Sequence, residues 1–207
     1  MATDFDEKAA TWDDDPAKVE RARVVAEAIR SAIPLTPDTR LLEYGAGTGL
    51  VAEALADDVG AITLAEPSAG MREVATAKVD LGTLPAGTRV WDLDLAATAP
   101  PSDERFDLIA TVMTLHHIHH LEPVLAGFAE LLGDGGRLAV VDLEAEDGSF
   151  HSEDSGFDGH HGFDRGALQA QLEAAGFSDV AFAQVHEIEK DGSTFPLFLA
   201  TGRIGAR

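Results

Sequence analysis

One short segment constrains the fold of this chain more than any other: residues 41–50, LLEYGAGTGL. Residues 40–43 have the apolar character of the end of a buried strand, and residues 50–55 that of the start of a helix. Between them stand Gly45, Gly47 and Gly49. Glycine suits a tight turn there because it adopts backbone angles that other residues avoid and lets a ligand approach the main chain. Amides at the helix start would face a bound polar group, so the segment predicts a nucleotide-binding turn.

The spacing of the three glycines separates two classes of cofactor. In the dinucleotide pattern G-x-G-x-x-G the third glycine would fall on Leu50, whereas here it comes one residue earlier, at Gly49. An acid, Glu43, also stands two positions before the first glycine. The pattern E-x-G-x-G-x-G resembles the first motif of class I S-adenosylmethionine-dependent methyltransferases. In that family the turn passes under the methionine and ribose part of the cofactor.

The length of the chain sets the number of domains that we expect. At 207 residues it can bury one large core but hardly two. We therefore predict a single domain over residues 1–207, in which residues 1–38 form an N-terminal segment and helix and residues 39–207 a Rossmann-like core. The N-terminal residues are either a lid over the cofactor or a loosely packed tail. The chain has no cysteine, which excludes disulfides, thiolate nucleophiles and cysteine-ligated zinc.

The charge of the chain bears on its partners. Its 37 acidic and 15 basic residues give a net charge of −22, which is unsuited to binding nucleic acid through phosphates. A neutral or cationic small molecule, or a basic protein segment, suits the field better, although acidity also serves solubility. No apolar run is long enough to cross a bilayer, and the acidic N-terminus is unlike a signal peptide. We expect a cytoplasmic protein with no membrane contact; the sequence gives no oligomeric state.

The order of apolar and polar stretches predicts the architecture. Strands are expected at residues 40–43, 59–66, 88–95, 106–112, 137–143, 179–189 and 195–203, with helices after the first, second, fourth and fifth of them. The helix over residues 16–33 can be capped by Asp15, and a helix ending at Ala175 can be capped by Asp164. The last two strands are joined through Asp191 and Gly192, a hairpin signal. Alternating strands and helices predict an α/β fold with a doubly wound, mostly parallel sheet and one antiparallel strand.

The resemblance to class I methyltransferases extends over residues 39–201. Its elements are EYGAGTG, the acid Glu66 followed by Pro67 and Met71, FDLIA ahead of TLHHI, a helix ending LLGDGGRL, and AGF before the final hairpin. The resemblance implies a three-layer, seven-stranded Rossmann-like sheet whose last strand is antiparallel. It also implies S-adenosylmethionine as methyl donor and S-adenosylhomocysteine as product.

Cofactor-binding residues follow from strand ends and from the resemblance. Glu66, an acid at the tip of the second strand, can accept both ribose hydroxyls. The resemblance implies that the glycine turn holds the methionine end and the ribose of the cofactor, and that the end of the fourth strand lines the far side of the cofactor. It also implies that Asp94 and Leu95 contact the adenine, and Asp92 is an alternative to Asp94. The full set of candidates is Glu43, Tyr44, Gly45, Ala46, Gly47, Glu66, Pro67, Met71, Asp94, Leu95, Thr111 and Met113.

Seven of the eight histidines fall in two stretches, residues 116–120 and 151–161, which such a fold brings to the same rim of the sheet. L-H-H is common at this point in small methyltransferases, so His116 and His117 could be structural or flank the cofactor. Alternatively, a histidine of the second stretch binds the acceptor or acts as general base. The catalytic candidates are His116, His151 and His161. A metal site completed by Asp142, Asp147 or Asp158 is a third reading; we expect no metal, because adjacent histidines seldom both ligate one ion.

The sequence thus predicts an S-adenosylmethionine-dependent methyltransferase that acts on a small-molecule acceptor. A protein methyltransferase and a non-catalytic cofactor-binding or regulatory protein are the alternatives. A nicotinamide oxidoreductase is disfavoured by Leu50. Nothing in the sequence identifies the acceptor or the atom that receives the methyl group.

Overall fold

The computed structural model describes residues 2–101, 103–151 and 157–205, without the side chains of residues 2–4. Its centre is a seven-stranded sheet in the order β3-β2-β1-β4-β5-β7-β6, in which β7 runs antiparallel to both of its neighbours. The strands are β1 Leu41–Tyr44, β2 Ile62–Ala65, β3 Arg89–Trp91, β4 Phe106–Val112, β5 Leu132–Leu143, β6 Phe177–Lys190 and β7 Ser193–Ile204. The predicted fold class is confirmed.

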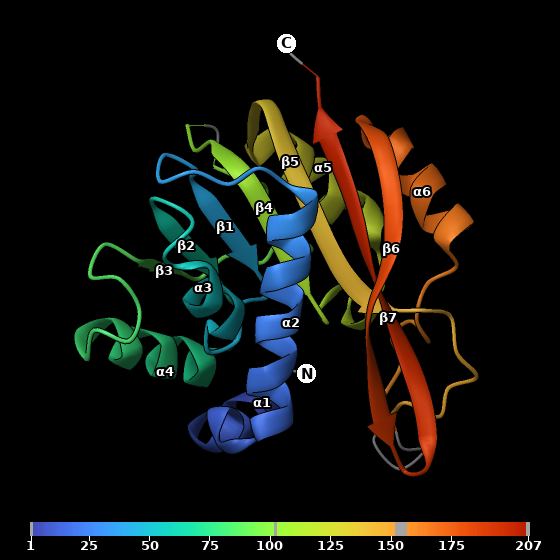
Figure 1. The fold of residues 1–207 in the computed structure, drawn as a ribbon, viewed down its shortest axis with the longest axis horizontal. Helices are drawn as coiled ribbons and strands as arrows, with labels where there is room; N and C mark the ends of the chain where they lie inside the picture. The colour runs from blue at the N-terminus through green and yellow to red at the C-terminus, as the bar shows by residue number, and fades with distance from the viewer. Residues whose placement is uncertain (1, 102, 152–156, 206–207) are drawn as a thin grey trace.

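Helices cover both faces of this sheet (Figure 1). They are α1 Ala2–Lys8, α2 Pro16–Ala32, α3 Leu50–Leu55, α4 Ala69–Asp80, α5 Leu121–Leu131 and α6 Arg165–Ala174, with the short 3-10 helices η1 Ala9–Asp14 and η2 Leu115–His117. One core packs α2 and α3 against the sheet, and the other packs α5 and α6 against its opposite face. The carboxyl ends of β1, β2 and β4 therefore meet at one edge between two helix layers, where ligands of such sheets bind.

Local signals explain the ends of several elements. Asp15 accepts a hydrogen bond from the Ala17 amide at the start of α2, and the predicted cap Asp164 accepts one from Ala167 at the start of α6. Asp191 and Gly192 both have positive φ, 52° and 81°, as expected of a two-residue hairpin turn between β6 and β7. In Figure 1 this hairpin extends beyond the rest of the sheet.

Three expectations differ from the structure. The N-terminal residues, which lack periodicity, form α1 and η1. Strand β3 is only Arg89–Trp91, so the two aspartates after it lie in a loop. Strand β5 begins at Leu132 instead of residue 137, because Leu132 pairs with Phe106 and residues 133–136 bulge out of the ladder before Arg137 pairs with Leu108. Among the described residues, no helix is long and apolar enough to span a bilayer.

Candidate active site

The glycine turn links the end of β1 to the start of α3, and its three glycines all have positive φ. A Cβ on Gly45 would lie 2.2 Å from the Cγ2 atom of Thr114, so the turn and the segment after β4 are in close contact there. A Cβ on Gly47 would meet only the Met71 sulfur, at 4.0 Å. Gly45 is therefore required by packing, whereas Gly47 leaves its face of the turn open to a ligand.

Glu66 lies at the tip of β2 and joins that strand to the turn. Its carboxylate accepts hydrogen bonds from the amides of Gly47 and Ser68, both at 2.8 Å. Burial raises the pKa of Glu66 above its usual value, and the two amide hydrogen bonds oppose that rise. The side chain is thus held directly beside the turn, where a ribose-binding carboxylate is expected.

Glu43 has a structural partner in the turn. Its carboxylate accepts a hydrogen bond from the Ala52 amide at 2.8 Å, which satisfies one of the free amides at the start of α3. The side chain is only 3% exposed, and this burial raises its pKa to about 8. The acid that precedes the glycines therefore anchors the helix from beneath the turn, whatever contact it makes with a cofactor.

The loop after β3 distinguishes its two aspartates. Asp92 forms an ion pair with Arg72 of α4 at 3.0 Å and is mostly exposed. Asp94 accepts a hydrogen bond from Ala96 and lies close enough to Tyr44 to raise the pKa of that phenol, after the larger effect of burial. The amide of Leu95, expected to meet the adenine, donates to the Tyr44 hydroxyl at 3.1 Å. The geometry favours Asp94 over Asp92 for a role at the end of the sheet.

The remaining cofactor candidates surround the same turn. Ala46, Met71 and Thr111 are buried, whereas Pro67 is exposed. Met113 has a positive φ of 54°, which is unusual for a non-glycine residue and occurs where neighbouring structure imposes it. Its amide donates to the carbonyl of Val141, which ties the segment after β4 to β5.

The N-terminal segment lies across this edge of the sheet. Asp13 accepts hydrogen bonds from the Thr48 hydroxyl at 2.5 Å and from the Lys78 ammonium at 2.9 Å. Asp6 accepts from the Ser68 hydroxyl at 2.6 Å and from the Gly70 amide at 2.8 Å, and these hydrogen bonds lower its pKa. Two acids of α1 and η1 therefore attach this segment to the glycine turn and to α4, as a lid would require.

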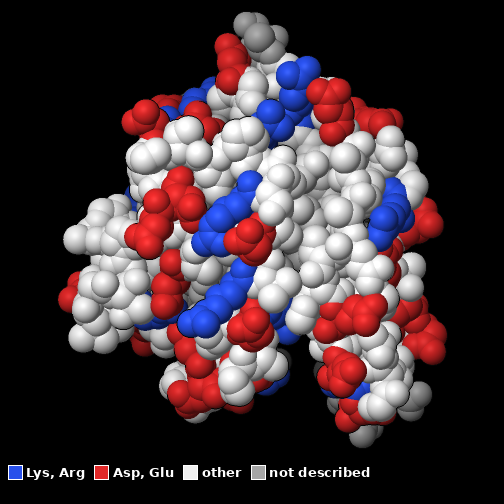
Figure 2. All heavy atoms as spheres, in the orientation of Figure 1, with Lys and Arg blue, Asp and Glu red and all other residues white. Residues whose placement is uncertain are grey.

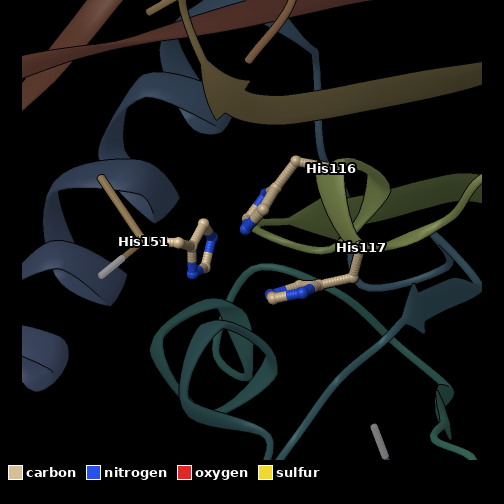
Figure 3. A group of neighbouring side chains, drawn as sticks. All are labelled: His116, His117 and His151. Carbon is tan, nitrogen blue, oxygen red and sulfur yellow. The ribbon is translucent and has the colours of Figure 1, made fainter. Parts of the chain in front are cut away.

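A group of histidines lies next to the turn, where β4 and β5 end. The Nδ1 atom of His116 lies 2.6 Å from the carboxylate of Asp142, and both side chains are only 1% exposed. The ring of His117 lies 4.1 Å from that of His116, and the ring of His151 lies 5.4 Å from both. Figure 3 shows the three rings, from η2 and from the loop after β5, converging on one point. Each offers a ring nitrogen within 4.8 Å of the others.

Aromatic rings enclose this histidine cluster, which we define as His116, His117 and His151. The ring of His151 stacks on Phe157 at 3.6 Å, and Phe5 of the N-terminal segment contacts His117 edge-on at 5.4 Å. Burial, and then the neighbouring His116, lower the pKa of His151 to about 4. His151 is therefore neutral at physiological pH, with one unprotonated ring nitrogen able to accept a hydrogen bond or bind a metal ion.

The structure brings together two of the three predicted catalytic histidines. His161 lies outside the cluster, half exposed, with its Nδ1 atom 3.4 Å from Glu146. Sequence reasoning did not single out His117 as catalytic and gave Asp142 only a part in a disfavoured metal site. The adjacency of His116 and His117, and the position of Asp142 near the end of a strand, were the available signals.

The sheet order and the glycine turn, with acids at the ends of β2 and β3, define a Rossmann-like fold of the nucleotide-binding kind. The sequence matches the family described as Methyltransferase domain over residues 17–181. The chain therefore belongs to this family and is a class I, S-adenosylmethionine-dependent methyltransferase. The resemblance described from its motifs is confirmed.

Individual relatives agree with this assignment. The chain is 29% identical over 137 residues to the 27-O-demethylrifamycin SV methyltransferase of Amycolatopsis mediterranei, a match covering 64% of this chain and 49% of that protein. It is 29% identical over 144 residues to the O-methyltransferase cnsE of Penicillium expansum, a match covering 65% of this chain and 50% of that protein. The chain spans half or less of the length of the curated relatives it matches.

A solved structure supports the fold over the whole length. It is described as an S-adenosylmethionine-dependent methyltransferase, possible histamine N-methyltransferase, from Thermotoga maritima. The TM-score is 0.71 at 21% identity, and the match covers 98% of this chain and 99% of that one. At this identity the likeness shows the fold alone.

Proposed function

We propose that this enzyme transfers the methyl group of S-adenosylmethionine to a small-molecule acceptor that binds against the histidine cluster. The observation that carries the proposal is the enclosure of that cluster. Phe5 lies against His117, and Phe157 stacks on His151, so the chain's own N-terminal segment and loop wall the site. Aromatic walls with a few convergent polar groups are typical of small-molecule sites, whereas a protein substrate needs an open groove.

The cofactor would lie against the glycine turn and Glu66, with its methyl group toward the histidines. Thr114 supports this orientation, because its hydroxyl donates to the Gly45 carbonyl at 3.2 Å and only one residue separates it from His116. The sulfonium already carries its leaving group, so the enzyme's main tasks are to align the acceptor with the methyl group and to exclude water. In this proposal α1 and η1 act as the lid, and His116, oriented by Asp142, and His151 face the acceptor.

A protein methyltransferase is the second candidate, favoured by charge. Figure 2 shows the lower edge of the molecule hollowed between the lobe of α1 and the end of the β6–β7 hairpin, with Asp and Glu on both sides. Such an edge would attract a Lys- or Arg-rich segment. It would equally attract a cationic small molecule, so charge alone does not separate the two.

The first experiment measures cofactor binding by calorimetry with S-adenosylhomocysteine, with NAD as a comparison ligand. We expect the wild type to bind S-adenosylhomocysteine and not NAD. In Glu66→Ala this binding should weaken by at least about tenfold, or 1.4 kcal/mol, because a hydrogen-bonding carboxylate is lost. Glu73→Ala removes an exposed acid of α4 and should bind like the wild type. A folded protein that binds neither ligand would refute the proposal.

The second experiment identifies the class of acceptor. The enzyme and methyl-labelled S-adenosylmethionine are incubated with a cell extract separated by ultrafiltration into small molecules and macromolecules. Label transferred in the small-molecule fraction, and lost with Glu66→Ala, supports the proposal. Transfer only to protein favours the second candidate, and cofactor binding with no transfer to either fraction indicates a non-catalytic binding protein.

A further inference from the structure

Three imidazoles converge in the histidine cluster, which is more than proton transfer requires. We propose that His116, His117 and His151 form a binding site for a divalent transition-metal ion of the zinc type, placed on the acceptor side of the methyl-transfer site. Their ligand atoms lie within 4.8 Å of one another. Ligand nitrogens on one tetrahedral ion, each about 2.0–2.1 Å from it, stand roughly 3.4 Å apart. The rings therefore need to move inward by little more than about 1 Å.

Asp142 is the second observation that points to a metal. Metal-binding histidines usually donate their other ring N–H to a carboxylate or carbonyl, which fixes the tautomer and the direction of the ligating nitrogen. Here the Nδ1 atom of His116 lies 2.6 Å from the Asp142 carboxylate, and the same carboxylate accepts from the backbone amides of His116 and Leu143. With Nδ1 committed to Asp142, the Nε2 atom is the one left to ligate.

The structure also answers the objection from sequence, that neighbouring histidines seldom bind one ion. His116 and His117 lie in the 3-10 helix η2, and their ring centres are only 4.1 Å apart. Both rings thus face the same point, as Figure 3 shows. His151 comes from the loop after β5 and is half-buried, so its ring is less enclosed than that of the buried His116.

The surroundings suit a cation. The loop that carries His151 returns to η2, where the His160 amide donates to the His116 carbonyl at 2.7 Å. Acidic side chains line the edge of the molecule (Figure 2), and the net charge is −22, so the field raises the local concentration of cations. Neutral imidazoles select ions such as Zn²⁺, Co²⁺ or Ni²⁺ over Mg²⁺ and Ca²⁺, which prefer oxygen ligands.

Three protein ligands leave a coordination position for an exogenous group, the arrangement of catalytic rather than structural zinc sites. This step rests on the proposed function: the acceptor would fill the open position, so we expect an acceptor with an oxygen ligand such as a hydroxyl or enol. The ion would lower the pKa of that group. Its proton would leave to water, and an oxygen–carbon bond would form as the sulfur–carbon bond of S-adenosylmethionine breaks, releasing S-adenosylhomocysteine.

The test measures metal binding directly, on untagged protein stripped with a chelator. Zn²⁺ is titrated by calorimetry, Co²⁺ by its visible d–d absorption, and retained metal is counted by elemental analysis. We expect one ion per chain with the absorption of a tetrahedral site. His117→Ala and His151→Ala should each weaken Zn²⁺ binding more than tenfold, and Asp142→Asn should do so by about 10–100-fold. His119→Ala and His161→Ala, from the same stretches but outside the cluster, serve as matched controls.

Three outcomes would overturn the proposal: no saturable Zn²⁺ binding, binding unchanged in both His117→Ala and His151→Ala, or equal losses in the two control variants. The conclusion does not depend on the buried His116, because His117 and His151 are only partly buried and their replacement is less disruptive. S-adenosylhomocysteine binding is measured on the same metal-free samples. Failure of the metal site and failure of the proposed function are therefore distinguished.

Discussion

The buried carboxyl of Glu43 predicts an unusual dependence of stability on pH. Glutamate in an unfolded chain has a pKa of 4.5, whereas burial beneath the glycine turn raises the pKa of Glu43 to about 8. Between these values the folded protein binds one more proton than the unfolded chain, so the free energy of unfolding falls as pH rises. At about 1.36 kcal/mol per pH unit, the total loss is of order 5 kcal/mol, a large part of a typical stability.

The variant Glu43→Gln isolates this effect because its amide oxygen can still accept from Ala52 but carries no charge. Urea unfolding, followed by tryptophan fluorescence between pH 5 and 9, gives the difference in stability between wild type and variant. We expect the stability of the wild type relative to the variant to fall from pH 5 to about pH 8 and to stay constant from there to pH 9. Above that pH the variant should be the more stable protein.

Glu104→Gln is a control of opposite sign. A hydrogen bond from Arg89 lowers the pKa of Glu104, so its contribution to stability is present above the unfolded-state value of 4.5 and is lost only as pH falls through the lower folded-state value. A difference curve for Glu43→Gln that is flat between pH 5 and 9 would refute the reasoning, because it would mean that Glu43 ionises normally in the folded protein.

Two further predictions concern the cofactor turn and the segment above it. Gly45→Ala and Gly47→Ala each place alanine at a left-handed position, which costs about 1–2 kcal/mol, but only the alanine at position 45 also overlaps Thr114. Gly45→Ala should therefore be the less stable variant in urea unfolding, whereas Gly47→Ala should stay folded and lose S-adenosylhomocysteine binding in calorimetry. Equal stabilities of the two variants would contradict this reasoning. Asp13→Asn should weaken S-adenosylhomocysteine binding by about 1 kcal/mol, or fivefold, because the hydrogen bonds that Asp13 accepts from Thr48 and Lys78 become weaker. Asp14→Asn changes an exposed neighbour and should leave that binding unchanged.

The features that the sequence predicted well are those with local causes. The glycine turn needs positive φ at three positions, and only glycine supplies it cheaply. The hairpin at Asp191 and Gly192 and the caps Asp15 and Asp164 depend on residues within a few positions of one another. Such signals are readable without knowledge of the rest of the fold.

The features that the sequence did not predict depend on distant partners. The N-terminal residues are helical, and their acids accept hydrogen bonds from residues distant in sequence. Asp6 accepts one from Ser68, 62 positions away, and Asp13 accepts one from Lys78, 65 positions away. The early start of β5 likewise depends on Phe106, which pairs with Leu132 while the glycines between Leu132 and Arg137 bulge. The glycines do mark the end of helix α5, at Leu131, as a glycine stop signal predicts, but the start of a strand at the next residue depends on the tertiary pairing.

The candidate site divides in the same way. Parallel strands β4 and β5 are neighbours, so their histidine-bearing continuations had to meet at one rim, and this much was predictable. Which histidines converge was not, because it depends on η2 and on the path by which the later loop returns to β5. That path is set by the contact of Phe163 with Glu144 and by the His160 amide at the carbonyl of His116, neither of which leaves a sequence pattern.

The two halves of the site also differ in charge, in a way that follows the reaction. Glu43 and Glu66 are buried carboxyls on the cofactor side, and burial raises the pKa of both, so a nearby cation such as the cofactor's sulfonium would favour their anionic forms. The acceptor side offers the imidazoles of the histidine cluster, with the Asp142 carboxylate against His116. Methyl transfer moves positive charge from sulfur toward the acceptor, so the group that then takes up or displaces a proton must lie on the histidine side. Whether that group is His116 or a metal ion is what the Zn²⁺ titration decides.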